Sequence, residues 1–219
     1  MASDFVLLSD PAIAAIATSD CGEPVIEATH LRLDRREDQY NPLLHYVRSG
    51  LHRRLLHAEQ SLPTGTHLLL IEGYRPPAVQ LHQFTAYADV LREQNPDWTP
   101  ERLRREASRF ISPPEVAPHC TGGAIDLTLC SADGVELDMG TEVNASPVAS
   151  ENRCYTAAPD ISAQAAANRR LLVATLTAAG LVNYPTEWWH WSYGERYWAW
   201  STGSDARYAP LSTDQVVTG

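Results

Sequence analysis

Two short segments that lie far apart in the chain must meet in space if their side chains are to act together, and this requirement constrains the fold most. The first runs from His119 to Asp126, and the second is Glu187-Trp-Trp-His190. Two imidazoles and one carboxylate form a typical three-ligand set for zinc, with a water in the fourth position. A metal ion acidifies such a water, and Glu187 is then a spare carboxylate that can accept its proton. The two segments together therefore indicate hydrolytic chemistry.

The spacing within each segment predicts a turn of the backbone. His119 and Asp126 are seven positions apart, and an odd separation places two side chains on opposite faces of a continuous strand. Gly122-Gly123 can supply the turn, because glycine adopts conformations that other residues avoid. We therefore expect His119 in a loop and Asp126 on the strand that follows. The second segment raises the same difficulty, which predicts a turn or bulge after Pro185.

Each segment also has an ordinary structural explanation. A histidine and an aspartate at this spacing are common by chance, and either segment alone is weak evidence for a metal site. The tryptophans around the second segment are interpreted mostly as core and surface aromatics. The remaining histidines are interpreted as surface or core residues without a metal role; they are His30, His45, His52, His57, His67 and His82.

Arg75 is a further candidate for the site. It follows a predicted strand and is held between Tyr74 and Pro76-Pro77. A rigid guanidinium beside a polarised carbonyl can stabilise the negative charge that develops on the oxygen. The alternative is a structural salt bridge, which the sequence alone favours.

Composition and charge exclude several classes of protein. The 219 residues suffice for one large domain with a substantial core, and the net charge of −10 disfavours a nucleic-acid partner. The N-terminus lacks the basic start of a signal peptide, and the apolar run over residues 12–17 is too short to span a membrane. We therefore expect a cytoplasmic protein without a membrane partner. The four cysteines form no C-x-x-C pair and are expected to be reduced.

Periodicity and turn residues predict a single α+β domain over residues 1–219, with a central, mostly antiparallel sheet flanked by helices. Residues 1–40 are expected to form an irregular N-terminal segment with short strands, and residues 201–219 a loosely ordered tail. A long loop is expected over residues 138–161. Helices are expected from Asn41 to the Pro63–Gly65 turn and over residues 78–94, 99–110 and 162–179, and strands over residues 67–72 and 124–129 and within 181–200.

Four motifs occur in a fixed order along the chain: Gly-Tyr-Arg75-Pro-Pro, His119-x-x-Gly-x-Ala-x-Asp126, Asp138-Met-Gly-Thr and Glu187-x-Trp-His190. In this order they resemble the motifs of the zinc D-alanyl-D-alanine dipeptidases, the VanX-type enzymes of vancomycin resistance and their bacterial relatives. The resemblance runs from about residue 67 to residue 200. Four motifs in the correct order are far more specific than any one of them.

The resemblance implies a complete hydrolytic site. His119, Asp126 and His190 would hold one Zn²⁺ per chain, and Glu187 would be the general base and then the acid for the leaving amine. Arg75 would polarise the scissile carbonyl. The implied fold is the small α+β architecture shared with zinc D,D-carboxypeptidases and the hedgehog signalling domain. The implied substrate is free D-Ala-D-Ala, held in a small closed site.

Two positions depart from the pattern of that family. Ala117 stands where the family usually has serine, and Asn144 stands where it has an acid that helps to hold the substrate ammonium. Loss of such a partner costs roughly 2–5 kcal/mol if nothing replaces it. Glu142 can replace it, because in an extended stretch it would share a face with Asn144. All three residues are therefore candidates for substrate binding.

We accordingly expect a zinc-dependent dipeptidase that hydrolyses D-Ala-D-Ala or a closely related dipeptide. One alternative is a D,D-carboxypeptidase that acts on peptidoglycan stem peptides. The other is a catalytically inactive zinc-containing binding module. The sequence specifies no oligomeric state.

Overall fold

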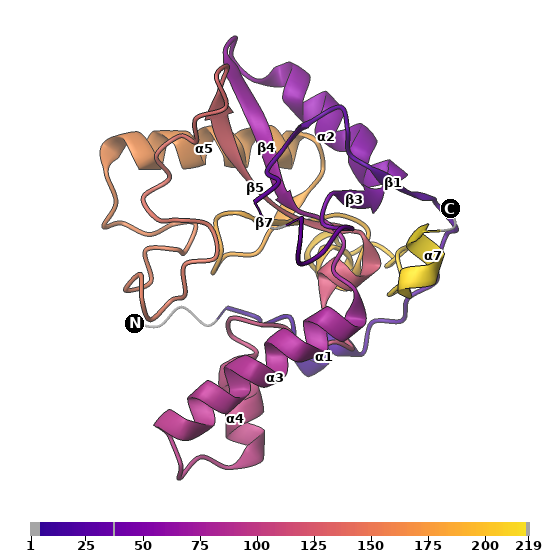
Figure 1. Cartoon of the computed structure of the whole chain (residues 1–219), viewed down its shortest axis with the longest axis vertical. Coiled ribbons are helices and arrows are strands. Elements are labelled where there is room, and N and C mark those ends of the chain that lie inside the picture. The colour runs from indigo at the N-terminus through magenta and orange to yellow at the C-terminus, as the bar shows by residue number, and fades with distance from the viewer. Residues whose placement is uncertain (1–4, 37, 218–219) are drawn as a thin grey trace.

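Figure 1 shows the computed structural model, which describes residues 5–36 and 38–217. The first residues of the chain, on which the expectation about a signal peptide partly rests, lie outside this range. Five strands form the central sheet in the order β2-β4-β5-β7-β6. Neighbouring strands are antiparallel, except that β2 and β4 run parallel. The strands are β2 (Arg32–Leu33), β4 (Thr66–Glu72), β5 (Ala124–Ser131), β6 (Val182–Asn183) and β7 (His190–Ser192).

Strand β5 illustrates how the two faces of the sheet differ. Ile125, Leu127 and Leu129 are fully buried and point to one face, because successive side chains of a strand alternate. They share a hydrophobic core with helices α2 (Ser49–Ser61) and α5 (Ala163–Ala178), which therefore cover that face. The intervening residues of β5 point to the opposite face, where the candidate site lies.

Helices α3 (Pro77–Gln94) and α4 (Pro100–Ala107) form a hairpin that extends away from the sheet, at the bottom of Figure 1. Thr99 caps α4, since its hydroxyl oxygen accepts a hydrogen bond from the Arg102 amide at 3.3 Å. The hairpin has a small apolar core of its own, formed by Phe84, Ala88 and Ala107. We refer to residues 77–112 as the α3–α4 hairpin.

The mixture of helices with a central, mostly antiparallel sheet confirms the predicted α+β class. The helix expected from Asn41, however, begins only with α2. The Asn41 side chain accepts a hydrogen bond from the Leu43 amide and donates one to the Tyr74 carbonyl, both at 3.0 Å, which stabilises a turn. The chain then forms β3 (Tyr46–Arg48), which pairs antiparallel with β1 (Val25–Glu27). Pairing with a distant strand thus overrides the helical spacing of the leucines.

The segment 181–200, which was expected to form strands, also contains the start of helix α6 (Arg196–Thr202). The Glu195 carboxylate accepts hydrogen bonds from the amides of Tyr197 and Trp198, both at 2.7 Å. A carboxylate in this position satisfies amides that the first turn of a helix leaves without partners. The cap therefore outweighs the strand preference of the aromatic residues around it.

Both ends of the described chain pack against its centre. The N-terminal segment contains the short helix α1 (Pro11–Ala14) together with β1 and β2. The tail differs from the loosely ordered one expected, because Tyr208 is fully buried and the described part of the chain ends in helix α7 (Thr213–Val217). The Tyr208 hydroxyl donates a hydrogen bond to Glu23 at 2.8 Å, which ties the tail to the N-terminal segment. No helix in the described ranges has the length and apolar character needed to cross a bilayer.

Candidate metal and catalytic site

Strands β5 and β7 bring Asp126 and His190 together. The two residues are direct partners in the antiparallel ladder, and both point to the face of the sheet away from α2 and α5. Trp191, the next residue of β7, is fully buried in the core on the other face. Side chains of directly opposite residues lie close together, and here Asp126 Oδ1 is 3.0 Å from His190 Nδ1.

The third residue of the cluster, His119, lies in a short 3-10 helix, η1 (Pro118–Thr121), which Gly122 ends in the left-handed conformation at φ +68°. This is the turn that the spacing of His119 and Asp126 predicts. The His119 Nδ1 atom is 2.7 Å from the Gly73 carbonyl oxygen. A carbonyl oxygen only accepts, so Nδ1 carries the proton and Nε2 presents its lone pair.

The three side chains form a cluster that fits a metal ion. His119 Nε2 lies 3.1 Å from His190 Nδ1 and 3.5 Å from Asp126 Oδ1. All three residues are at most 4% exposed, and their potential ligand atoms lie within 4.8 Å of one another. Buried acceptors at such distances repel one another unless a cation or a proton lies between them. Two imidazole nitrogens and one carboxylate oxygen are a donor set that suits zinc.

The two histidines determine the charge of the buried Asp126 carboxyl group. Burial alone would raise the pKa of Asp126, but His119 and His190 outweigh this effect and hold the pKa well below its usual range. The hydrogen bond from His119 to Gly73 orients the first imidazole, as partners of metal-binding histidines commonly do. The carboxylate is therefore ionised and the first imidazole is oriented by the fold itself.

Glu187 lies beside the cluster on the turn that follows Pro185. Its Oε2 atom is 3.9 Å from His190 Nδ1. The Asn183 side chain donates hydrogen bonds to the carbonyls of Glu187 and His190, both at 3.0 Å, and so holds the turn. Burial raises the pKa of Glu187 to about 8. A carboxyl group tuned in this way can accept a proton and return it near neutral pH.

Arg75 is held by two partners at the edge of the cluster. Its Nε and Nη2 atoms donate to the Glu72 carboxylate at 2.7 and 2.5 Å, and Nη1 donates to Gln80 Oε1 at 3.0 Å. Burial lowers the pKa of Arg75, but Glu72 and Asp126 more than reverse this effect. The salt bridge that the sequence alone favoured is present. The salt bridge and the hydrogen bond to Gln80 together use three of the five N–H donors of the guanidinium. Two donors remain for a ligand.

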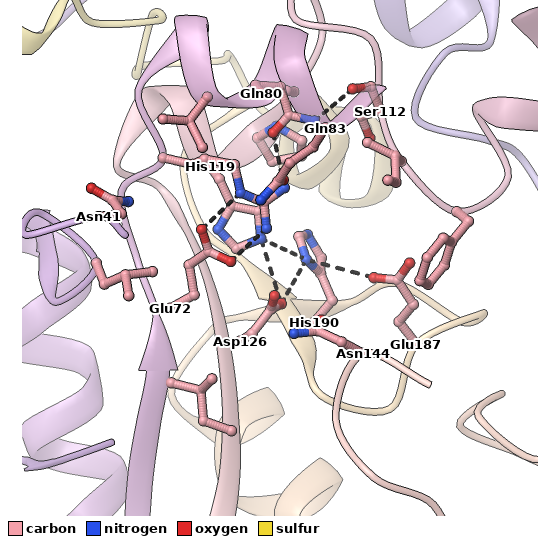
Figure 2. A pocket seen from close by; sticks show the side chains of 18 of the residues that line it. Asn41, Glu72, Gln80, Gln83, Ser112, His119, Asp126, Asn144, Glu187 and His190 are labelled. Carbon is pink, nitrogen blue, oxygen red and sulfur yellow. Dashed lines mark hydrogen bonds and ion pairs between the residues drawn. The ribbon is translucent and has the colours of Figure 1, made fainter. Parts of the chain in front are cut away.

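A cavity of about 440 Å³ adjoins the cluster. Figure 2 shows side chains that line it. Its lining includes the three residues of the cluster, together with Arg75 and Glu187. Ala117 and Asn144 line the same cavity, whereas Glu142 is exposed and is not among its lining residues.

Glu72 and Gln80 are site residues that the sequence interpretation did not single out. Glu72 ends strand β4, and Gln80 lies in the first turn of α3, so the two flank the Gly-Tyr-Arg75-Pro-Pro motif. Both are buried, with exposed fractions of 7% and 1%. A buried strand that ends in a glutamate three residues before a candidate arginine is a signal that could have identified Glu72.

The long loop over residues 138–161 forms another side of the site and is held by one arginine. Arg169 of α5 donates hydrogen bonds to the carbonyls of Met139, Arg153 and Tyr155 at 2.6–2.7 Å. Arg169 is 2% exposed, and its burial lowers its pKa to about 10. The backbone of the loop is therefore fixed although it contains no regular secondary structure.

Comparisons of sequence agree with the motifs. The profile of a protein family described as D-ala-D-ala dipeptidase matches residues 45–208. A D-alanyl-D-alanine dipeptidase of Synechocystis sp. is 29% identical over 222 residues, covering 85% of this chain and 88% of the relative. A protein of the same name from Enterococcus faecium is 36% identical over 143 residues, covering 63% of this chain and 67% of the relative.

Among solved structures, the chain is similar to VanYB in complex with D-Alanine-D-Alanine, with a TM-score of 0.46, 15% identity and coverage of 74% of this chain and 80% of that one. It is also similar to the LdcB LD-carboxypeptidase, with a TM-score of 0.47, 15% identity and coverage of 86% and 77%. The family profile spans most of the chain and includes every residue of the cluster, Arg75 and Glu187. The chain therefore belongs to the peptidase M15 family of D-Ala-D-Ala dipeptidases and is a hydrolase.

Proposed function

We propose that the protein is a zinc-dependent dipeptidase that hydrolyses D-Ala-D-Ala or a closely related dipeptide. His119, Asp126 and His190 would hold one Zn²⁺. The observation that carries the proposal is the convergence of two imidazole nitrogens and a carboxylate oxygen within 3.5 Å of one another, with Glu187 close by. A purely structural zinc site needs neither a spare buried carboxyl group nor a buried guanidinium at its edge.

A bound zinc ion would acidify a water and polarise the scissile carbonyl. Glu187 accepts the proton of the attacking water and then delivers it to the nitrogen of the leaving amine. Its position beside His190 lets one carboxyl group serve both steps, and its raised pKa favours the return of the proton. The cluster side chains and Glu187 are buried, which strengthens each of these electrostatic interactions.

Arg75 supplies positive charge where the carbonyl oxygen becomes negative. Glu72 and Gln80 fix the plane of its guanidinium before substrate arrives. A donor that needs no reorganisation during the reaction stabilises the transition state more than a mobile one does. The two N–H groups that are not used by Glu72 and Gln80 are available to the substrate.

The test is release of D-alanine from D-Ala-D-Ala by the purified protein. The protein is first stripped with a chelator and then supplied with Zn²⁺, Mg²⁺ or no metal. We expect cleavage that depends on one zinc per chain, and no cleavage of L-Ala-L-Ala. Metal content is measured in parallel, so that activity and binding are compared in the same sample.

Each other outcome has a definite meaning. Cleavage that survives complete removal of metal would reject the zinc mechanism. Stoichiometric zinc without cleavage of any peptide in a panel of free and N-acylated D,D-peptides would favour the inactive binding module. Cleavage of N-acylated stem peptides alone would favour the D,D-carboxypeptidase.

A further inference from the structure

The turn between β6 and β7 carries Glu187 and leads directly into His190 of the cluster. Glu187 is the carboxyl group to which the proposed function assigns proton transfer. A shift of about 1 Å in a reacting group can lower a rate by roughly 100-fold. The contacts that hold this turn therefore bear on catalysis, even where they lie outside the cavity.

The side chain of Asn183, on β6, adds to the hydrogen bonds of the turn itself. Within the turn, the Glu187 amide donates to the Tyr184 carbonyl at 3.0 Å, and the His190 amide donates to the Glu187 carbonyl at 3.3 Å. The Asn183 Nδ2 atom donates to the carbonyls of Glu187 and His190, both at 3.0 Å, and so uses both of its N–H groups. One side chain thus joins the backbone of the candidate base to that of a candidate metal ligand.

Thr156, in the 138–161 loop, fixes the orientation of the Asn183 amide. Its hydroxyl donates to Asn183 Oδ1 at 2.6 Å, and its backbone amide donates to the Pro185 carbonyl at 3.0 Å. The nitrogen of the Asn183 side chain faces two carbonyls and its oxygen faces a hydroxyl, so only one orientation of the amide satisfies all three contacts. Thr156 thereby attaches the loop both to Asn183 and to the turn.

This part of the loop is itself held on its other side. The carbonyls of Arg153 and Tyr155 accept hydrogen bonds from Arg169 of α5 at 2.7 and 2.6 Å. The carbonyl between them, that of Cys154, accepts a hydrogen bond from the Trp188 amide at 3.1 Å. Successive carbonyls thus bind α5 and the turn in alternation, and the loop fixes the turn relative to the helix.

Resting on the proposed function, we infer that Asn183 and Thr156 are positioning residues for hydrolysis. Asn183 fixes the distance between the Glu187 carboxyl group and His190, and Thr156 acts by fixing Asn183. Neither Asn183 nor Thr156 is among the residues that line the cavity, so neither contacts the substrate. Their loss should therefore lower kcat and leave KM nearly unchanged.

The first experiment measures kcat and KM for D-Ala-D-Ala with the zinc-saturated native enzyme and an Asn183→Ala variant, well below the melting temperature of each. We expect kcat to fall by roughly 10- to 100-fold, because the turn loses two hydrogen bonds and Glu187 shifts. KM should change by less than about twofold. Zinc affinity, measured by competition with a chelator, should weaken by at most roughly tenfold.

Asn95→Ala is the matched control. The Asn95 side chain also donates to a backbone carbonyl at 3.0 Å, that of Leu91. It lies at the end of α3 and is not among the residues that line the cavity. The control loses the same kind of hydrogen bond and should keep the native kcat and KM. An equal fall of kcat in both variants would overturn the inference, because a general loss of stability would then explain it.

A milder pair of variants tests the role of Thr156 and decides the question if Asn183→Ala does not fold. Thr156→Val keeps the backbone amide and removes the hydroxyl, and it should lower kcat by roughly 3- to 10-fold. Thr156→Ser keeps the hydroxyl and should restore kcat, which a role in packing alone does not predict. Added to Asn183→Ala, the valine substitution should cause no further fall, because Thr156 acts through Asn183.

The possible results separate this inference from the proposed function. A native enzyme that binds zinc and cleaves no peptide would overturn the proposed function. An active native enzyme with an unchanged kcat in Asn183→Ala would overturn the inference alone. A loss that is confined to KM, or that is explained entirely by loss of zinc, would also overturn it. Additive effects of the two substitutions would overturn the role assigned to Thr156.

Discussion

The cavity has two walls that differ in how they are built. The sheet wall consists of η1, β5 and residues 187–190, and it carries the three residues of the cluster and Glu187. The loop wall consists of the α3–α4 hairpin and the 138–161 loop, and it carries Asn144 and the apolar residues of the hairpin. Strand pairing fixes Asp126 and His190 of the sheet wall, and a short 3-10 helix and a turn position His119 and Glu187. The loop wall presents its groups from a helical hairpin and from a loop without regular secondary structure.

Burial follows the same division. The cluster residues and Glu187 are at most 9% exposed, whereas Asn144 is exposed. Catalytic groups must be held rigidly where charge develops in the transition state. Side chains that distinguish substrates commonly lie on loops, where substitutions are tolerated. The comparison predicts that the groups for hydrolysis and the groups that contact variable parts of a substrate come from separate parts of the chain. Two substitutions at the site test this division, and a third, outside both walls, tests the stability of the fold.

The strongest test is Glu187→Gln in the sheet wall. We expect kcat to fall by roughly 10²–10⁴-fold, because general acid–base catalysis is lost while the shape of the side chain is kept. Zinc content and the KM for the preferred peptide should change little. Glu93→Gln, on the exposed side of α3, is the control for loss of one carboxylate. A variant with full activity would remove Glu187 from its proposed role.

The second test concerns Gln80, a buried residue of the α3–α4 hairpin that contacts Arg75. Its side chain accepts from Arg75 and donates to the Ser112 carbonyl at 2.6 Å. Gln80→Leu should reduce kcat by about tenfold, the worth of one hydrogen bond to a charged group. Gln80→Glu retains the acceptor for Arg75 and should recover much of kcat, which a purely structural role for Gln80 does not predict. A loss confined to KM would show that Gln80 only shapes the cavity.

The smallest effect on activity is expected for Asp20→Asn, which lies outside both walls. Burial would raise the pKa of Asp20, but hydrogen bonds from Arg48 and from the amides of Gly22 and Ala209 outweigh it, so the pKa is below 3.8. A carboxylate with a lowered pKa stabilises the fold above pH 3.8, and this contribution is lost as the pH falls through the lowered value.

We therefore expect Asp20→Asn to destabilise the protein by on the order of 1 kcal/mol at pH 7, because solvent screens part of the charge of this partly exposed carboxylate. The difference from the native protein should shrink as the pH is lowered below 3.8. Urea unfolding at both pH values measures it, with Asp133→Asn in an exposed turn as the control. A difference that does not change with pH would show that the charge of Asp20 is not the cause.

The sequence predicts the sheet wall well, because its chemistry depends on residue type and on spacing. His119, Asp126, Glu187 and His190 meet as expected, and the turns occur at Gly122-Gly123 and after Pro185. Their roles stay predictions until activity is measured. The α+β class follows from the order of periodic segments, and the structure confirms it.

The loop wall is less predictable, because its contacts depend on segments with no periodic pattern. Asn144 lines the cavity whereas Glu142 does not, a result of the local backbone of the loop and not of strand-like alternation. Local hydrogen bonds at Asn41 and Glu195 likewise decide the elements around them. Periodicity contains no information about such contacts.

The hydrogen bonds from Arg169 to the backbone carbonyls of the 138–161 loop affect how this enzyme can evolve. Backbone carbonyls are present whatever side chains the loop carries. Substitutions along the loop can therefore alter the preferred peptide while the backbone retains its path. One buried arginine on α5 thus makes the loop a tolerant site for evolving new specificities and for engineering them.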